Sequence, residues 1–108
     1  MRRVRFTRLA ARDLIHELTY SQRTFGNAAE ATLRERFREL WRAIERDPTR
    51  VGRPIGPSRY RYGMRREKLV VLYHWQGGQD ADPVVMAVIS ARRNLTRRSV
   101  TAYFRRRI

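Results

Sequence analysis

The stretch from residue 68 to residue 90, KLVVLYHWQGGQDADPVVMAVIS, decides the fold. Residues 68–75 and 83–90 are almost entirely apolar, and short apolar runs without alternation predict strands that are covered on both faces. The polar segment between the two runs contains Gly77-Gly78, which predicts a hairpin loop. Pro83 is compatible with the second run because it stands at the first position of a strand. The stretch therefore predicts two antiparallel strands in the middle of a sheet.

Before this stretch, residues 59–65 alternate between basic and apolar side chains, which predicts a strand with one basic face. The basic positions are Arg59, Arg61 and Arg65, and Arg66-Glu67 forms the turn to the next strand. Residues 49–57 contain two glycines and two prolines, so this segment is predicted to be a loop.

The N-terminal part predicts a short strand followed by a helix. Val4 and Phe6 alternate with polar residues, and Thr7 can cap the helix that follows. The apolar positions of that helix have the spacing of a single helical face, and Gly26 marks its end. The predicted apolar stripe consists of Ala11, Leu14, Ile15 and Leu18.

A second helix is predicted directly after Gly26. Asn27 and Glu30 have the spacing of a capping box, and Glu30 with Arg34 has that of a favourable ion pair. The helix is predicted to end at Asp47-Pro48. Because almost no loop separates the two helices, they must fold back as an antiparallel hairpin. The apolar face of the second helix consists of Ala29, Leu33, Phe37, Leu40, Trp41 and Ile44, with Phe37 and Trp41 expected in the core.

These elements predict one α+β domain that spans residues 1–108. Its element order is β-α-α-β-β-β, an antiparallel sheet packed against an N-terminal helical hairpin. Residues 92–108 carry seven arginines and no acid. The helical spacing of Val100, Tyr103 and Phe104 suits a short basic C-terminal helix, and a frayed basic tail is the alternative.

Composition and missing motifs exclude several classes of function. The chain has no cysteine and two histidines, which removes disulfide scaffolds, thiolate metal sites and thiol nucleophiles. Motifs for phosphate-binding loops, zinc hydrolases and serine hydrolases are absent. The longest apolar run, residues 84–89, is far shorter than the roughly 20 residues that span a bilayer. We therefore expect no metal, no cofactor, no membrane contact, and a cytoplasmic protein.

The charge of the chain is large and unevenly distributed. The chain has 25 Lys+Arg and 10 Asp+Glu, a net charge of +15. Residues 8–47 carry eight arginines and seven acids, whereas residues 48–108 carry fourteen cations and three acids. Such a basic field attracts nucleic acid, anionic membrane or an acidic protein partner. Arginine suits bidentate contacts to phosphate or carboxylate, and a GC-rich genome gives the same bias without a functional cause.

One constellation, a basic cluster, could carry chemistry. Arginines beside an aromatic ring suit phosphate contacts and base stacking. Cleavage of RNA without metal also needs general acid–base help, for which His74 is a candidate. A solvated basic face, a dock for an acidic peptide and a structural His74 remain open alternatives. The cluster consists of Arg59, Arg61, Arg65, Arg92 and Arg93, with Tyr103 able to return towards them.

The ordered set of motifs resembles the RelE/ParE toxin superfamily. Within the superfamily, the resemblance is closer to the ParE branch. The similarity covers about residues 3–94. The resemblance implies the toxin of a bacterial type II toxin–antitoxin pair, neutralised by a small protein antitoxin wrapped around it. The matching motifs are Val4-Arg5-Phe6-Thr7, Ala11-Arg12-Asp13-Leu14, Phe25-Gly26, Leu69-Val70-Val71-Leu72-Tyr73-His74-Trp75 and Ala91-Arg92-Arg93.

The superfamily has two activities, and the residues favour one of them. In the RelE branch, ribosome-dependent cleavage of mRNA relies on an arginine three residues before the tyrosine that matches Tyr73. Val70 occupies that position here. The long hairpin with Asp13-Leu14 and Phe25-Gly26 is similar to the ParE branch, whose members poison DNA gyrase. We predict a gyrase inhibitor, with a ribosome-dependent ribonuclease as the alternative and a nucleic-acid-binding module as the third possibility.

Each activity assigns roles to the same residues. Target or phosphate contacts are expected from Arg59, Arg61, Arg65, Arg92 and Arg93. If the protein is a ribonuclease, its catalytic residues are Arg61, Arg65, Arg92, Arg93, His74 and Tyr103. Antitoxin contacts are expected from Arg97, Arg98, Tyr103 and Phe104.

Overall fold

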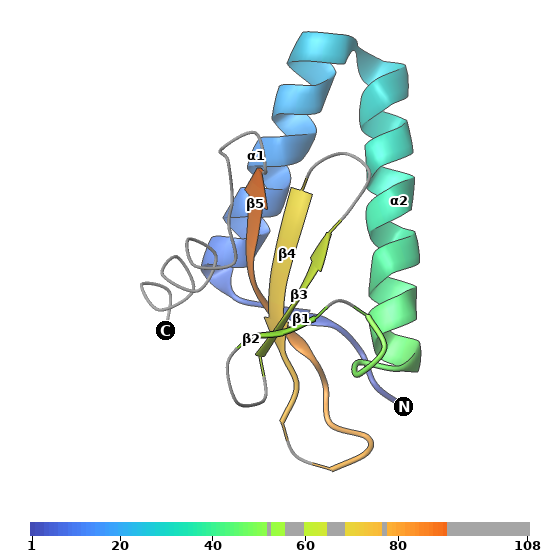
Figure 1. Ribbon diagram of the computed structural model, residues 1–108. Helices are drawn as coiled ribbons and strands as arrows, with labels where there is room; N and C mark the ends of the chain where they lie inside the picture. The colour runs from blue at the N-terminus through green and yellow to red at the C-terminus, as the bar shows by residue number, and fades with distance from the viewer. Residues whose placement is uncertain (52, 56–59, 65–68, 77, 91–108) are drawn as a thin grey trace.

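The computed structural model describes residues 1–51, 53–55, 60–64, 69–76 and 78–90. The strands of this part form one sheet in the order β1-β5-β4-β3-β2, and two helices lie side by side along it (Figure 1). The predicted α+β class and N-terminal helical hairpin are confirmed. In chain order the elements are β1 (Arg5–Phe6), α1 (Arg8–Phe25), α2 (Asn27–Arg46), β2 (Arg53–Ile55), β3 (Tyr60–Met64), β4 (Leu69–His74) and β5 (Val84–Ser90).

The sheet is mixed, which corrects the prediction of an antiparallel sheet. The pairs β2–β3, β3–β4 and β4–β5 are antiparallel, and the last of these is the central pair that residues 68–90 predict. Strand β1 instead runs parallel to β5, with Arg5 opposite Val84 and Phe6 opposite Val85. No tight turn joins β1 to its neighbour, because both helices and three strands intervene in the chain. A long connection of this kind permits a parallel pair.

A strand that the sequence did not predict, β2, lies within the expected loop at residues 49–57. It pairs with β3, and Pro54 lies opposite Arg61. Proline is tolerated at a sheet edge because one side of an edge strand needs no ladder hydrogen bonds. The predicted four-strand order therefore becomes a five-strand order.

Gly26 joins the two helices without a loop, as predicted. Its φ of 96° lies in the region that favours glycine, and its N–H donates to the carbonyl of Gln22 at 2.9 Å. The predicted capping box of Asn27 and Glu30 is wrong. Asn27 is already the first residue of α2, and its Oδ1 accepts a hydrogen bond from Gln22 Nε2 at 2.9 Å. Gly26 both ends α1 and precedes α2, so the capping position has no side chain.

The start of α1 is confirmed, because Thr7 Oγ1 accepts a hydrogen bond from the Ala10 N–H at 3.1 Å. Its apolar stripe is only partly as predicted, since Ala11 is exposed and Ile15 is 64% exposed. The helix turns polar side chains towards the interior as well as apolar ones, so apolar spacing alone misplaces the buried face. The buried residues of α1 are Ala10, Glu17, Leu18 and Ser21, with Leu14 partly buried.

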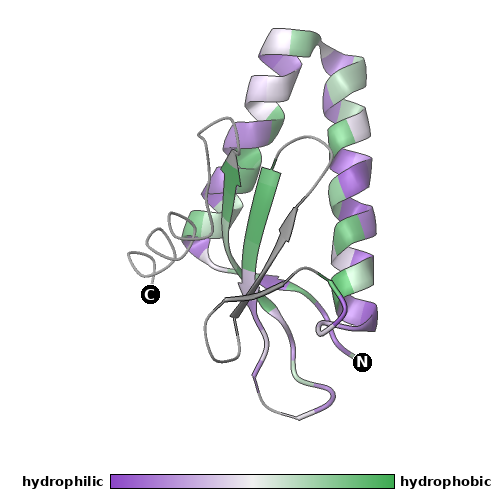
Figure 2. Ribbon diagram, in the orientation of Figure 1, coloured by the Kyte–Doolittle hydropathy of each residue, from purple (hydrophilic) through white to green (hydrophobic). Residues whose placement is uncertain are grey.

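The hydrophobic core lies between the hairpin and the sheet. The predicted apolar face of α2 is confirmed, because Phe37 is buried and stacks on the partly buried Trp41 with ring centroids 5.5 Å apart. Figure 2 shows the apolar strands β4 and β5 against helices with mixed hydrophilic and apolar surfaces. The core residues of the sheet and of α2 are Leu33, Phe37, Ile44, Leu69, Val71, Tyr73, Val85 and Val88.

Strands β4 and β5 are buried on both faces, as their continuous apolar runs predicted. The residues that alternate with the helix-side core positions are also buried, namely Val70, Leu72, Ala87 and Ile89. No helix among the described residues is both long and apolar enough to cross a membrane. The predicted C-terminal helix or tail, residues 92–108, lies outside the described residues.

Candidate functional site

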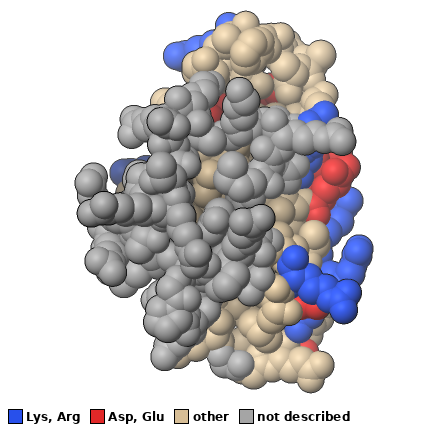
Figure 3. Space-filling model, viewed as in Figure 1, with Lys and Arg blue, Asp and Glu red and all other residues tan. Residues whose placement is uncertain are grey.

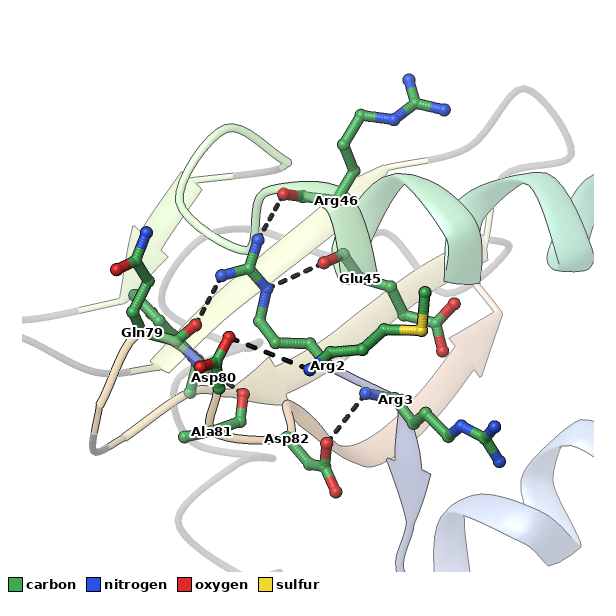
Figure 4. Close-up of polar contacts among 10 residues, drawn as sticks. Arg2, Arg3, Glu45, Arg46, Gln79, Asp80, Ala81 and Asp82 are labelled. Carbon is green, nitrogen blue, oxygen red and sulfur yellow. Dashed lines mark hydrogen bonds and ion pairs between the residues drawn. The ribbon is translucent and has the colours of Figure 1, made fainter.

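The first residues of the chain tie the end of α2 to the loop between β4 and β5 (Figure 4). The Arg2 guanidinium donates from Nε to the Glu45 carbonyl at 2.8 Å, from Nη1 to the Gln79 carbonyl at 2.6 Å, and from Nη2 to the Arg46 carbonyl. Glu45 and Arg46 end α2, where unpaired carbonyls favour a cation. We call Arg2–Arg5, Glu45, Arg46, Gln79 and Asp82 the N-terminal junction.

Two carboxylates complete the N-terminal junction. Asp82 accepts hydrogen bonds from the Arg3 N–H at 2.8 Å and from Arg5 Nε at 3.0 Å. These two hydrogen bonds, the first above all, hold the pKa of Asp82 below its ordinary value. Glu45 accepts a hydrogen bond from the Val4 N–H at 2.8 Å. Each carboxylate accepts a hydrogen bond from a backbone N–H of Arg3 or Val4. The N-terminal junction therefore holds the first residues in place against the rest of the fold.

The exposed side of α2 carries charges of both signs (Figure 3). The predicted pair of Arg34 and Glu30 is confirmed, with Nη2 and Oε1 2.6 Å apart. Glu35 lies 3.3 Å from Arg38 and 3.9 Å from Arg42. Exposed pairs of this kind contribute little to stability, typically about 0–1 kcal/mol each. They make this side of the helix electrically balanced, as the charges of residues 8–47 predicted.

A cavity of about 530 Å³ opens between the second half of α1 and the first half of α2. We call it the interhelical cavity, and its volume is in the range of pockets that hold a ligand or a partner's side chains. Its walls are mainly small, apolar or aromatic. Among the described residues it is lined by Glu17, Tyr20, Ser21, Phe25, Ala28, Ala29, Thr32, Leu33, Arg36 and Leu69.

Two ionisable side chains of opposite sign line the interhelical cavity. Glu17 comes from α1 and is 8% exposed, and Arg36 comes from α2 and is half-buried. Two aromatic residues, Tyr20 and Phe25, meet edge to face with centroids 6.4 Å apart. Phe25 is 69% exposed although it is a large apolar side chain. An apolar cavity with few polar groups suits binding.

The residues of β4 that the sequence analysis singled out are buried or half-buried in the fold. The Tyr73 hydroxyl is buried and lies 2.7 Å from the Pro48 carbonyl and 2.5 Å from the Val51 carbonyl, so it anchors the turn after α2. Val70 is completely buried. His74, the last residue of β4, is half-buried and has an interaction partner.

The predicted basic cluster falls largely outside the described residues. Arg61 lies in β3 and pairs with Tyr73 of β4, which places its backbone one register position from the Tyr60–His74 pair. The structure therefore brings Arg61 and His74 onto neighbouring strands, and it does not test the other members. Outside the described residues lie Arg59, Arg65, Arg92, Arg93, Arg97, Arg98, Tyr103 and Phe104.

Sequence reasoning missed the interhelical cavity. A signal for it was present, because Glu17 stands between Leu14 and Leu18 on the buried side of α1, where a carboxylate is unusual. The adjacent alanines, Ala28 and Ala29, leave room at the start of α2. Within the described ranges, no three or more His, Asp or Glu residues are grouped so that they could hold a metal ion.

Two comparisons with known proteins found a match, one to a family model and one to a solved structure. A family model described as "ParE toxin of type II toxin-antitoxin system, parDE" matches residues 4–95, most of the chain. A solved structure titled "Chromosomal ParDE TA system from P. aeruginosa" is similar, with a TM-score of 0.69 and 16% sequence identity. The match covers 83% of this chain and 96% of that chain, and at this identity it shows a shared fold. A search of curated proteins found no match.

Proposed function

This chain belongs to the ParE toxin family of type II toxin–antitoxin systems, and from that membership we propose that it inhibits DNA gyrase, and so bacterial growth, when no antitoxin is bound. The family's system, parDE, implies a cognate ParD antitoxin that neutralises it. The proposed inhibition is a protein–protein contact without metal or cofactor. It takes place in the cytoplasm, where gyrase acts on DNA.

One observation carries the choice of gyrase over mRNA as the target. Val70 stands where the ribonuclease branch has an arginine, and it is completely buried in β4. Cleavage of RNA without metal builds up negative charge on the phosphate in the transition state, which an enzyme stabilises with positioned cations. A buried valine cannot supply one, and β4 contains no lysine or arginine. This supports a target that is bound rather than cleaved.

The charge of the chain supports an antitoxin with an acidic surface. At a net charge of +15, the positive side chains of the free toxin repel one another. An oppositely charged partner relieves this repulsion and speeds association. The proposed antitoxin contacts are Arg97, Arg98, Tyr103 and Phe104. The proposed target contacts are Arg59, Arg61, Arg65, Arg92 and Arg93.

Inducible expression in a bacterium, with and without the ParD antitoxin, tests the proposal. Toxin alone is expected to cause filamentation, DNA breaks and the DNA-damage response while translation continues, and the antitoxin is expected to restore growth. The purified toxin is expected to inhibit DNA supercoiling by gyrase in vitro. Cleavage of mRNA at ribosome-bound codons, with supercoiling unaffected, would establish the ribonuclease instead. Nucleic-acid binding without any growth defect would establish the binding module.

Two variants locate the contact with the target. Arg93→Ala is expected to reduce toxicity more than Arg61→Ala, because Arg93 follows the last strand directly beside the basic tail. Arg12→Ala, on the exposed side of α1, is the matched control. Binding to the antitoxin verifies that each variant is folded. Full toxicity of both arginine variants would show that the basic cluster is not the principal contact, since binding energy concentrates in few residues.

A further inference from the structure

The outer side of α1 carries a row of cations that the charge count along the chain does not reveal. Residues 8–47 are nearly neutral as a whole, with eight arginines and seven acids. In α1 the two signs are separated, because every basic side chain of this helix is exposed. At 3.6 residues per turn these positions fall within about 80° of the helix circumference, opposite the buried side. We call them the α1 stripe, which consists of Arg8, Arg12, His16 and Arg23.

Both acids of α1 lie away from the α1 stripe. Asp13 is half-buried, and its Oδ2 accepts a hydrogen bond from the Val88 N–H at 3.1 Å. Glu17 is 8% exposed and lines the interhelical cavity. Within the described part of the chain, the arginines of the stripe form no ion pair, whereas three exposed arginines of α2 pair with acids of their own helix. The stripe is therefore an uncompensated line of positive charge.

The length and straightness of the α1 stripe suit a row of phosphates. The stripe runs from Arg8 to Arg23, which at 1.5 Å per residue is about 22 Å. Each strand of duplex DNA carries one phosphate about every 3.4 Å along the helix axis. A stripe of this length therefore faces several phosphates of one backbone at once. Arginine pairs with phosphate oxygens through two N–H groups, and His16 can donate a further hydrogen bond.

Other classes of anionic partner fit the α1 stripe less well. Single-stranded nucleic acid is held by aromatic rings that stack on its bases, but the aromatic residues of α1, Tyr20 and Phe25, line the interhelical cavity instead. A helix that lies on a membrane needs an apolar face, and α1 buries its apolar face in the core. An acidic helix of another protein needs an apolar seam. The exposed apolar residues Leu9 and Ile15 lie on opposite sides of the stripe and form none.

We infer that the α1 stripe binds the phosphate backbone of duplex DNA without regard to base sequence, and that in the cell this duplex is the DNA held by gyrase. The inference rests on the proposed function, because gyrase supplies the duplex. Contact with both the enzyme and its DNA gives the toxin a higher affinity for gyrase on DNA than for either one alone. Phosphate contacts are shared among several cations, so Arg12→Ala alone is expected to leave toxicity near that of the wild type.

Two triple variants of the full-length toxin, matched in charge, test the inference. The stripe variant carries Arg8→Gln, Arg12→Gln and Arg23→Gln. The control variant carries Arg34→Gln, Arg38→Gln and Arg42→Gln on the exposed side of α2. Both variants lose three positive charges, and glutamine preserves the helix. Because all six positions are exposed, both melting temperatures are expected to stay near that of the wild type.

The first measurement is the fluorescence anisotropy of a labelled duplex of about 20 base pairs over a salt series. The stripe variant is expected to bind on the order of tenfold more weakly at 0.1 M salt, whatever the duplex sequence. The slope of log affinity against log salt is expected to fall by about 0.9 for each lost contact. The control variant is expected to stay within about threefold of the wild type, because it loses only long-range attraction.

The second measurement is the inhibition of DNA supercoiling by purified gyrase. Half-inhibition is expected to require on the order of tenfold more of the stripe variant than of the wild type, and about the wild-type amount of the control variant. Inhibition by the stripe variant equal to that of the wild type would show that DNA held by gyrase is not the ligand.

Three results of the binding measurement would overturn the inference. Equal loss of affinity in both variants would show that net charge, and not the α1 stripe, governs binding. Wild-type affinity of the stripe variant for the duplex would show that the stripe does not contact DNA. A larger loss for single-stranded RNA or for the ParD antitoxin than for the duplex would assign the stripe to that partner. Failure of the proposed function looks different, because the wild-type toxin would then leave supercoiling unaffected whatever its affinity for DNA.

Discussion

The Asp13 side chain accepts a hydrogen bond from the backbone of β5, beyond the point where β1 pairs with that strand. Strand β1 pairs with only the first two residues of β5. Farther along, the Val88 N–H donates to Asp13 Oδ2 at 3.1 Å, and Thr7 Oγ1 donates to the Met86 carbonyl at 3.4 Å. The ladder between β4 and β5 has an irregularity at this level, between Leu72 and Tyr73. The side chains of Thr7 and Asp13 therefore satisfy backbone groups of β5 that lie beyond its pairing with β1 in the described part of the chain.

Replacing Asp13 is expected to destabilise the fold. Asp13→Ala leaves the partly buried Val88 N–H without its acceptor, which costs about 1–3 kcal/mol in the free energy of unfolding. Asp13→Asn keeps an acceptor oxygen and is expected to lose less. Urea denaturation of both variants measures the difference, with Arg12→Ala as the exposed neighbour that should stay near wild type. Equal stability of Asp13→Ala and wild type would show that the hydrogen bond is dispensable.

At the level of elements, the N-terminal junction joins four parts of the fold: β1, the end of α2, the β4–β5 loop and the start of β5. Arg2 binds carbonyls from α2 and from the loop, and the ring of Trp75 lies 5.9 Å from its guanidinium carbon. Trp75 Nε1 in turn donates to the Ala81 carbonyl at 2.9 Å. Because these contacts are mostly to backbone, they depend on the positions of the elements more than on their sequences.

The junction makes stability depend on pH in the acid range. Hydrogen bonds from Arg3 and Arg5 lower the pKa of Asp82 from its ordinary value of 3.8. A carboxylate with a lowered folded-state pKa stabilises the fold above its unfolded pKa, and this stability is lost as pH falls through the folded pKa. Asp82→Asn is therefore expected to lower the melting temperature at neutral pH and to match wild type in strong acid. A melting-temperature difference that persists unchanged in acid would contradict this role.

Local signals in the sequence predicted most of the helices and strands. They did not predict how distant segments of the chain pair. Thr7 and Gly26 act on residues within one turn, so their roles could be read directly from the chain. The parallel β1, by contrast, depends on Val84, which lies far away in sequence. β2 is three residues long and contains Pro54, so no periodicity can identify it. Glu17 and Arg36 line the same cavity because of the direction in which each helix turns its faces. The apolar spacing of α1 did not predict that direction.

At the scale of the whole molecule, the large net positive charge is the feature that bears on the proposed encounter with an acidic antitoxin. The chain carries a net charge of +15, and the charges along the exposed side of α2 are largely paired. If the antitoxin is acidic, as proposed, its long-range attraction is expected to act through the rest of the molecule. Salt screens such attraction, with a Debye length of about 10 Å at 0.1 M.

Association with the antitoxin is expected to slow steeply as salt is added. Raising the ionic strength is expected to reduce the association rate constant tenfold or more, on the order of effects seen for steered complexes. The dissociation rate is expected to change little, because it reflects short-range contacts that salt screens weakly. Stopped-flow mixing over a salt series measures both. An association rate independent of salt would contradict electrostatic steering.

The parallel pairing of β1 with β5 has a consequence for synthesis of the toxin. A ribosome delivers the chain from its N-terminus, so Arg5 is made about eighty residues before its partner Val84. The helical hairpin is synthesised early, but its apolar inner face stays uncovered until β4 and β5 have been made. Arg2 likewise waits for Gln79 before it can close the junction. The sheet therefore cannot be completed before Val84 has been synthesised, late in the translation of the chain.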